Sequence, residues 1–168
     1  MFIWRGMKIG VPKEIKPQEN RIGLTPESVK NLVSNGHEVL VENNGGFEAG
    51  FDNDHYKSSG AKLVKNAEDI FNDSEIIVKV KEPLSNEVKM IKENQIIFTY
   101  LHLAAAKELT QGLVDYKSIC IAYETVTDNN GRLPLLAPMS AVAGRMSVQA
   151  GAHCLEKKKK GRGLLLGG

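Results

Sequence analysis

The chain has 168 residues, of which 42% are hydrophobic and 25% charged, and its formal net charge is +2. These values are ordinary for a soluble globular protein with one sizeable core, and they argue against a disordered, fibrous or membrane protein. A net charge this small gives no support for binding to nucleic acid or to an anionic membrane.

The cysteines and the first residues bear on cellular location. Cys120 lies in the apolar run SICIAY and is predicted to be buried, while Cys154 falls in a predicted helix. Free, buried thiols fit a reducing cytosol, so we expect a cytoplasmic protein. No Cys or His spacing is typical of a metal site, so no metal is expected. Residues 1–6, MFIWRG, are too short for a signal peptide and are predicted to be an extension to which we assign no function.

Short apolar runs alternate with amphipathic segments along most of the chain. In chain order, they predict a strand at 8–14, a helix capped by Thr25 that stops near Gly36, a strand at 37–42, a short helix capped by Asp52 or Asp54, a strand at 61–64, a short helix at 67–71, a strand at 74–80, a helical turn capped by Ser85, a strand at 95–101, a helix at 104–116 and a strand at 118–124.

This repeated β-α order predicts the fold class. The strands are near-continuous apolar runs, as expected when both faces of a sheet are covered. We therefore expect an α/β fold with a doubly wound, mostly parallel sheet flanked by helices, of the Rossmann-like or flavodoxin-like kind. The dinucleotide fingerprint GxGxxG does not occur anywhere in the sequence.

The last part of the chain has a different pattern. Asn130-Gly131 predicts a turn, and a helix rich in Ala, Gly and Ser is predicted from Ser140 to about Lys159. Small side chains let backbones approach closely, so this helix either packs tightly on the domain's own sheet or bridges to a second domain or subunit. The lysine run at 157–160 is interpreted as a solvated helix end that the helix dipole favours.

Candidate functional residues follow three of the predicted strands, and parallel strands bring such positions to one sheet edge. Arg21 follows the first strand and can bind a carboxylate through two hydrogen bonds, although a solvated loop arginine fits the sequence too. Lys79 and Lys81 end the strand at 74–80, lie two residues apart and are expected on one face. One of them can polarise a carbonyl, or both can be strand-end lysines that extend to solvent.

His102 follows the strand at 95–101 and lies between Leu101 and Leu103. It is either a buried core histidine or a general acid/base, because an imidazole titrates near neutral pH. Glu124 ends the strand at 118–124 and is a minor candidate. Together these residues predict an anion clamp, a cationic partner for a carbonyl and an acid/base, which suit a small oxo acid or amino acid.

Several stretches resemble the alanine dehydrogenases, in order and at suitable spacing. They are KIGVPKEIKPQENRIGLTPESV, VKVKEP, IIFTYLHLAA, IAYETV and LPLLAPMSAVAGRMSVQAGAHCLE. The related NAD-binding subunit of proton-translocating transhydrogenase is an alternative. The resemblance weighs against it because transhydrogenases lack the KVKEP pattern and a histidine at the position of His102. A non-catalytic, truncated binding module is a second alternative.

The resemblance implies the N-terminal, substrate-side part of an NAD-dependent enzyme that interconverts L-alanine with pyruvate and ammonium. It implies that Arg21 and Lys81 bind the substrate, that His102 is the acid/base and that Ser140 contacts the cofactor. NAD would be bound mainly by a domain beyond this chain, so the chain alone is expected to be inactive. The implied organisation is a substrate domain at 7–139, an interdomain helix and linker at 140–168, and a homo-oligomer at full length.

Overall fold

The computed structural model describes residues 5–166, and its central feature is a parallel sheet of six strands in the order β3-β2-β1-β4-β5-β6. The strands are β1 (Lys8–Val11), β2 (Glu38–Glu42), β3 (Lys62–Val64), β4 (Ile76–Val78), β5 (Ile96–Thr99) and β6 (Ile119–Ala122). All neighbouring strands pair in parallel, with Ile9 opposite Val39 on one side and Ile76 on the other. This is the Rossmann order rather than the flavodoxin order, so the predicted doubly wound class is confirmed.

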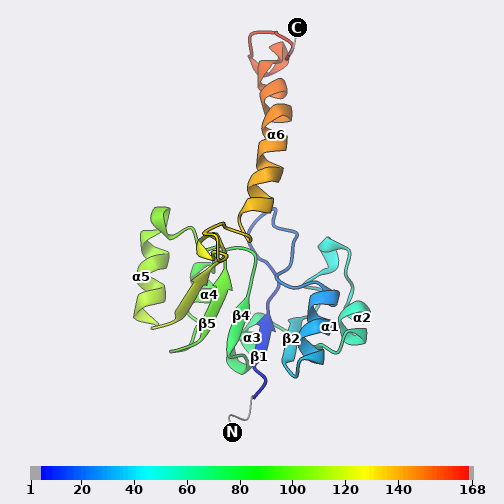
Figure 1. Cartoon of the computed structure of the whole chain (residues 1–168), viewed down its shortest axis with the longest axis vertical. Helices are drawn as coiled ribbons and strands as arrows, with labels where there is room; N and C mark the ends of the chain where they lie inside the picture. The colour runs from blue at the N-terminus through cyan, green and yellow to red at the C-terminus, as the bar shows by residue number, and fades with distance from the viewer. Residues whose placement is uncertain (1–4, 167–168) are drawn as a thin grey trace. The chain divides into compact units, whose positions relative to one another are not determined.

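Helices connect these strands as the sequence predicts. They are α1 (Pro26–Ser34), α2 (Asn53–Ser58), α3 (Ala67–Asp73), α4 (Ser85–Val88) and α5 (Lys107–Asp115), with 3-10 turns at Phe47–Ala49 and Leu103–Ala105. In Figure 1, α1 and α2 lie beside β2, whereas α4 and α5 lie beside β5. The strands are shorter than predicted because the hydrogen-bonded pairing stops before the apolar run does.

Each face of the sheet has its own core. Val39 and Val41 of β2 pack in a cluster with Val29 of α1 and Tyr56 of α2. Leu40, between those two valines, points to the opposite cluster, which contains Ile70 and Phe71 of α3, Ile77, Ile97 and Leu113. The alternation along β2 therefore serves two apolar faces, as a sheet covered on both sides requires.

Gly10 of β1 allows α3 to approach the sheet closely. A Cβ atom at this position would lie 2.4 Å from the Ser74 hydroxyl and 2.6 Å from a methyl of Ile70. The missing side chain is thus replaced by atoms of α3 and of the residue that follows it, and β1 becomes the central strand against which the helix rests.

Helix caps follow the predictions with one exception. The Thr25 side chain accepts a hydrogen bond from the Ser28 amide, and the Asp52 carboxylate accepts from the amides of Asp54 and His55. The predicted cap at Ser85 is wrong, because Leu84 is the N-cap of α4 and Ser85 is the first helical residue. The Leu84 amide is instead bound by the Glu87 side chain, at 2.8 Å.

The expected burial of Cys120 is also wrong. Cys120 and Cys154 are both exposed, and Ile119 and Ile121 of β6 are 47% and 40% exposed. β6 is an edge strand that pairs only with β5, so its apolar run lacks the cover that the inner strands receive.

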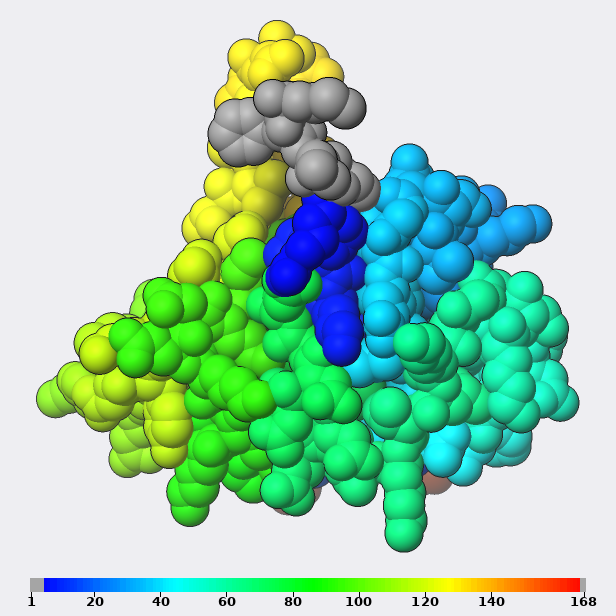
Figure 2. Space-filling model, turned by 90° about the horizontal axis from the view of Figure 1, so that it is seen from below, coloured from blue at the N-terminus to red at the C-terminus, as the bar shows by residue number. Residues whose placement is uncertain are grey.

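Part of the N-terminal extension is described, whereas residues 1–4 of it lie outside the described residues, as do residues 167–168 of the predicted linker. Arg5 forms an ion pair with Glu75 at 2.6 Å, and Glu75 also accepts a hydrogen bond from the Lys8 amide. Figure 2 shows this first blue segment between the light-blue and green segments that follow it in the chain. Arg5 is therefore tied to the residue that precedes β4.

The described residues form two compact units that divide between Tyr123 and Glu124. The second unit contains the predicted turn, in which the Asp128 side chain accepts hydrogen bonds from the amides of Asn130 and Arg132. Its long helix α6 (Ala137–Leu155) starts earlier than predicted and is followed by an exposed 3-10 turn at Lys157–Lys159. Its start at Ala137 fits Pro138 in the first helical turn.

Candidate active site

The carboxyl ends of β1, β4 and β5 lie side by side, because these strands are neighbours in the sheet. Arg21, Lys81 and His102 follow β1, β4 and β5 respectively, so all three lie beyond the same sheet edge, as the sequence predicts. The direction of strand order reverses between β1 and β4, and open α/β sheets bind ligands at such a point.

The loop that carries Arg21 is pressed against the end of β4. Ile22 is buried in the core, and a Cβ atom on Gly23 would lie 2.5 Å from the carbonyl oxygen of Val78. Only glycine permits this approach of two backbones. Ile22 and Gly23, which follow Arg21, thus hold the loop against the end of β4 and determine the position of Arg21.

Glu19 orients the Arg21 guanidinium. Glu19 Oε1 accepts from Arg21 Nε at 2.8 Å, and Glu19 Oε2 accepts from Arg21 Nη2 at 2.7 Å. The hydrogen bond with Glu19 raises the pKa of Arg21, and the hydrogen bond from Arg21 lowers the pKa of Glu19, to which the charge of Lys81 also contributes. Because the Arg21 side chain is 45% exposed, it remains accessible to a solute.

Lys79 and Lys81, which the sequence predicts on one face, differ in their burial. β4 ends at Val78, and the Lys79 side chain is 0% exposed, with its ammonium 2.7 Å from Glu87 Oε1 and 3.2 Å from Glu14 Oε2. Lys79 therefore neutralises carboxylates of its own domain. Lys81 is half-buried, and its carbonyl accepts a hydrogen bond from the Thr99 hydroxyl at 2.9 Å.

His102 is exposed and not a core residue. Its φ of +51° is left-handed, which turns the chain between buried Leu101 and the 3-10 turn that starts at Leu103. Its imidazole stacks on the Tyr100 ring, with the ring centres 6.0 Å apart and the planes at 13°. The strained backbone at this position directs the ring away from the apolar core.

Tyr100 belongs to an aromatic cluster that supports His102. Its ring meets Tyr123 edge-on at 4.9 Å, and Tyr123 meets Phe98 edge-on at 4.4 Å. Burial raises the pKa of Tyr123, with smaller contributions from Tyr100 and Glu14. Tyr123 thus presents a neutral phenol to Tyr100, the residue on which His102 stacks.

Electrostatic effects link the three sequence-predicted residues. Tyr100, which stacks on His102, contributes to the raised pKa of Arg21, and Lys81 contributes to the lowered pKa of Glu19. Glu19 and Tyr100 therefore connect the surroundings of Arg21 with those of Lys81 and His102, respectively. Sequence reasoning did not single out Glu19 or Tyr100, although Glu19 lies only two residues from Arg21.

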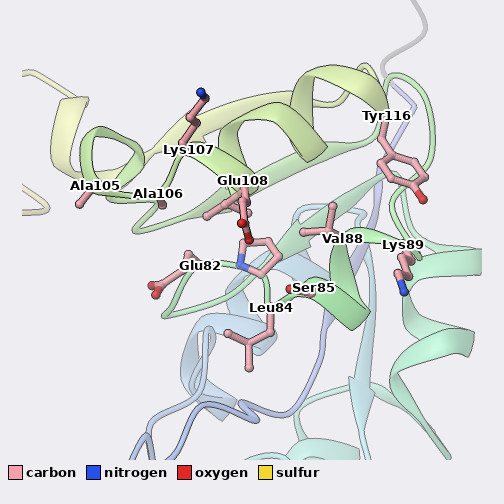
Figure 3. Close-up of a pocket in the computed structure, with 12 residues that line it drawn as sticks. Glu82, Leu84, Ser85, Val88, Lys89, Ala105, Ala106, Lys107, Glu108 and Tyr116 are labelled. Atoms are coloured by element: carbon pink, nitrogen blue, oxygen red, sulfur yellow. The ribbon is translucent and has the colours of Figure 1, made fainter.

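A groove of about 680 Å³ adjoins this edge between α4 and α5. Figure 3 shows its lining, with Leu84 and Val88 on one side, Ala105 and Ala106 on the other, and Glu82 at one end. Burial opposes ionisation of Glu82, but its hydrogen bond with Lys16, with a smaller contribution from His102, lowers the pKa of the carboxyl. Its second oxygen is buried and has no hydrogen-bond partner among the described residues.

The switch point does not fit a dinucleotide. The segment between β1 and α1, which holds the pyrophosphate in dinucleotide-binding folds of this order, is long here, lacks the glycine-rich turn and contains the buried acidic side chain of Glu14. Glu42 at the end of β2, where an acidic residue would bind a ribose, instead accepts a hydrogen bond from the Lys13 amide at 2.9 Å. Burial raises the pKa of Glu42.

Ser140 lies in the second unit, in the first turns of α6, and its amide donates to the Leu136 carbonyl at 3.1 Å. Within residues 5–166, no group of three or more His, Cys, Asp or Glu side chains is arranged to hold a metal ion. No helix in that range is both long and apolar enough to cross a bilayer.

These features define a class of protein, namely a doubly wound α/β domain of Rossmann order that lacks the glycine-rich turn after β1 and has Arg21, Lys81 and His102 in the segments that follow β1, β4 and β5. The chain belongs to the family described as alanine dehydrogenase/PNT, N-terminal domain, whose sequence profile matches residues 10–143.

Curated relatives agree with this assignment. The chain is 56% identical over 162 residues to an alanine dehydrogenase of Staphylococcus epidermidis, and 53% identical over 162 residues to one of Halomonas elongata. Each match covers 96% of this chain but only 43% and 44% of the respective relative. The chain thus spans less than half the length of the curated relatives it matches.

Solved structures agree as well. An L-alanine dehydrogenase structure superposes with a TM-score of 0.85 at 54% identity, covering 96% of this chain and 45% of that one. A transhydrogenase from Sinorhizobium meliloti gives a TM-score of 0.68 at 24% identity, covering 73% of this chain and 35% of that one. The second match shows a shared fold alone.

Proposed function

We propose that this chain is the substrate-binding, N-terminal part of an alanine dehydrogenase, which interconverts L-alanine with pyruvate and ammonium. The single observation that carries the proposal is the convergence of Arg21, Lys81 and His102 at one edge of the sheet. The family match and the identity to curated alanine dehydrogenases support it.

The proposed roles follow from the chemistry of the side chains. Arg21, oriented by Glu19, binds the substrate carboxylate, since a guanidinium matches a carboxylate in geometry and charge. Lys81 neutralises the same carboxylate and polarises the carbonyl of pyruvate. His102 is the acid/base, because an imidazole can both accept and donate a proton, and this one is exposed where it stacks on the Tyr100 ring.

Bound NAD would supply the hydride acceptor for the α-carbon of alanine in this proposal, while the residues of this chain handle the protons and charges of the substrate. The substrate then becomes an iminium, and His102 removes a proton from the water that attacks it. His102 then returns a proton to the nitrogen of the resulting carbinolamine. The C–N bond breaks, ammonia leaves, and the carbinolamine hydroxyl gives up its proton to the neutral imidazole, which yields pyruvate. Lys81 stabilises negative charge that develops on the substrate oxygen during these steps.

The cofactor is proposed to bind mainly through a domain of the complete protein outside these residues, with Ser140 as a contact from this chain. The switch point between β1 and β4 does not suit a dinucleotide, and this supports the proposal that the cofactor binds mainly outside these residues. We further propose a substrate domain at 7–139, an interdomain helix and linker at 140–168, a homo-oligomeric complete protein and a cytoplasmic location. On this proposal, residues 1–168 alone do not reduce NAD.

A chimeric enzyme tests the proposed function. In it, this chain replaces the matching N-terminal part of the staphylococcal relative, so that every residue of the candidate edge comes from this sequence. The expected result is alanine-dependent reduction of NAD by the chimera and none by residues 1–168 alone. A folded chimera that oxidises another amino acid but not alanine would contradict the proposed substrate, and activity of the isolated chain would contradict the proposed division of the sites.

A further inference from the structure

Glu14 joins the two sides of the switch point. It lies in the segment after β1, is 7% exposed, and its carboxylate reaches across to the end of β4. Its Oε1 accepts hydrogen bonds from the amides of Val80 at 2.6 Å and Lys81 at 3.3 Å. One buried carboxylate thus binds the backbone amide of Lys81, the residue that binds substrate in the proposed function.

Lys79 supplies the positive charge that Glu14 needs in a buried position. Glu14 Oε2 is 3.2 Å from the Lys79 ammonium, and both side chains are almost completely excluded from solvent. A buried carboxylate without a counter-ion is strongly unfavourable. The ion pair with Lys79 therefore compensates the burial of the Glu14 carboxylate, and a carboxylate is a strong acceptor for backbone amides.

Glu87 is the other carboxylate on Lys79, and it differs from Glu14 in one respect. Its Oε1 is 2.7 Å from the Lys79 ammonium, and its side chain is as deeply buried as that of Glu14. Its second oxygen accepts from the Leu84 amide, not from the amides of Val80 and Lys81. Glu87 therefore links Lys79 to the start of α4 and not to the backbone of Lys81.

We propose that Glu14 is a positioning residue, which sets Lys81 for the substrate through the backbone amides of Val80 and Lys81. The inference rests on the proposed function, because it gives a role to Lys81. Glu14 does not touch substrate in this proposal. It fixes the start of the segment from which the Lys81 side chain extends, while the Thr99 hydroxyl holds the Lys81 carbonyl from β5.

The test uses Glu14→Gln and Glu87→Gln in the chimeric enzyme. Both remove one buried charge from Lys79, but only Glu14→Gln weakens the bonds to Val80 and Lys81. We expect Glu14→Gln to raise the KM for pyruvate about tenfold and to change the KM for NADH less than twofold, because small displacements of a binding group have large effects on reactivity. Glu87→Gln should change the KM for pyruvate less than twofold.

Each outcome is decisive. If Glu14→Gln leaves the KM for pyruvate unchanged, or if Glu87→Gln raises it equally, the positioning role is wrong and the network serves stability alone. If the unsubstituted chimera is folded and does not use pyruvate, the proposed function fails instead, so the two failures are distinguishable.

A second measurement covers the case in which Glu14→Gln does not fold. Glu14→Asp keeps a carboxylate for Lys79 but shortens its reach to the amides. In residues 1–168 labelled with ¹⁵N, pyruvate should shift the Lys81 amide resonance, and Glu14→Asp should weaken this binding about tenfold. Binding by Glu14→Asp that matches the unsubstituted chain would overturn the proposal.

Discussion

The carboxylate of Glu19 holds the guanidinium of Arg21 through two hydrogen bonds, to Nε and to Nη2, although the two residues are only two positions apart. The Glu19 carboxylate also accepts from the Arg21 amide at 3.0 Å. The pair makes the arginine a rigid group before any substrate arrives, which reduces the entropy lost on binding.

Glu19→Gln should therefore affect both substrate binding and acid stability. In the chimera we expect the KM for alanine to rise by a few fold, since an amide orients a guanidinium less firmly than a carboxylate. The lowered pKa of Glu19 means that its contribution to stability is present above the ordinary value of 4.5 and is lost as the pH falls below it. Urea unfolding at pH 7 and pH 3.5 should show a smaller loss of stability for Glu19→Gln than for the unsubstituted chain. Equal losses of stability in the two proteins between pH 7 and pH 3.5 would contradict the pairing of Glu19 with Arg21.

Gly23→Ala should destabilise the chain and displace Arg21. The added Cβ atom would meet the Val78 carbonyl at 2.5 Å, so the loop must move away from β4. We expect a loss of about 1–3 kcal/mol in the free energy of unfolding, typical of overpacking. The matched control is Gly144→Ala in α6, where nothing lies within 4 Å of the new atom. That control should be neutral or slightly stabilising, and a similar loss in both variants would argue against the contact.

Tyr56 should make stability fall at high pH. Its hydroxyl donates to the Leu24 carbonyl at 2.9 Å, and burial raises the pKa of Tyr56 from 10.0 to about 12. The folded state keeps the phenol proton longer than the unfolded chain does, so this contribution is present below pH 10 and is lost as the pH rises towards 12. Tyr56→Phe should lose about 1 kcal/mol at pH 8. Its free energy of unfolding should then decline less steeply above pH 10, and parallel curves would contradict the assignment.

Arg21→Ala and Lys81→Ala should act on substrate more than on folding. The Arg21 side chain is 45% exposed and Lys81 is half-buried, so neither removal opens the core. A charge-assisted contact to a carboxylate is worth about 1.5–3 kcal/mol. We expect kcat/KM for alanine in the chimera to fall at least tenfold, while the melting temperature remains within about 2 °C. Normal alanine kinetics in both variants would contradict the proposed binding of substrate by Arg21 and Lys81.

The sequence predicted the sheet and the positions of Arg21, Lys81 and His102, because both depend on local patterns and on the rule that parallel strands end at one edge. It did not reveal Glu14 or separate Lys79 from Lys81. Glu14 and Lys79 are 65 residues apart, and their contact depends on how closely β1 and β4 approach. Cys120 was misjudged for a related reason, since an apolar run does not show whether its strand lies inside the sheet or at its edge.

His102 provides the most direct test of the proposed activity. Alanine-dependent NAD reduction should be measured for the chimera carrying His102→Ala and, as a control, His55→Ala, which changes an exposed histidine of α2 paired with Asp52. We expect His102→Ala to lower kcat by about 10²–10⁴-fold while NADH binding, followed by fluorescence, is unchanged, because the variant lacks the positioned acid/base. His55→Ala should retain normal turnover. If His102→Ala retains the kcat of the unsubstituted chimera, the histidine is not the acid/base and the proposed active site is wrong.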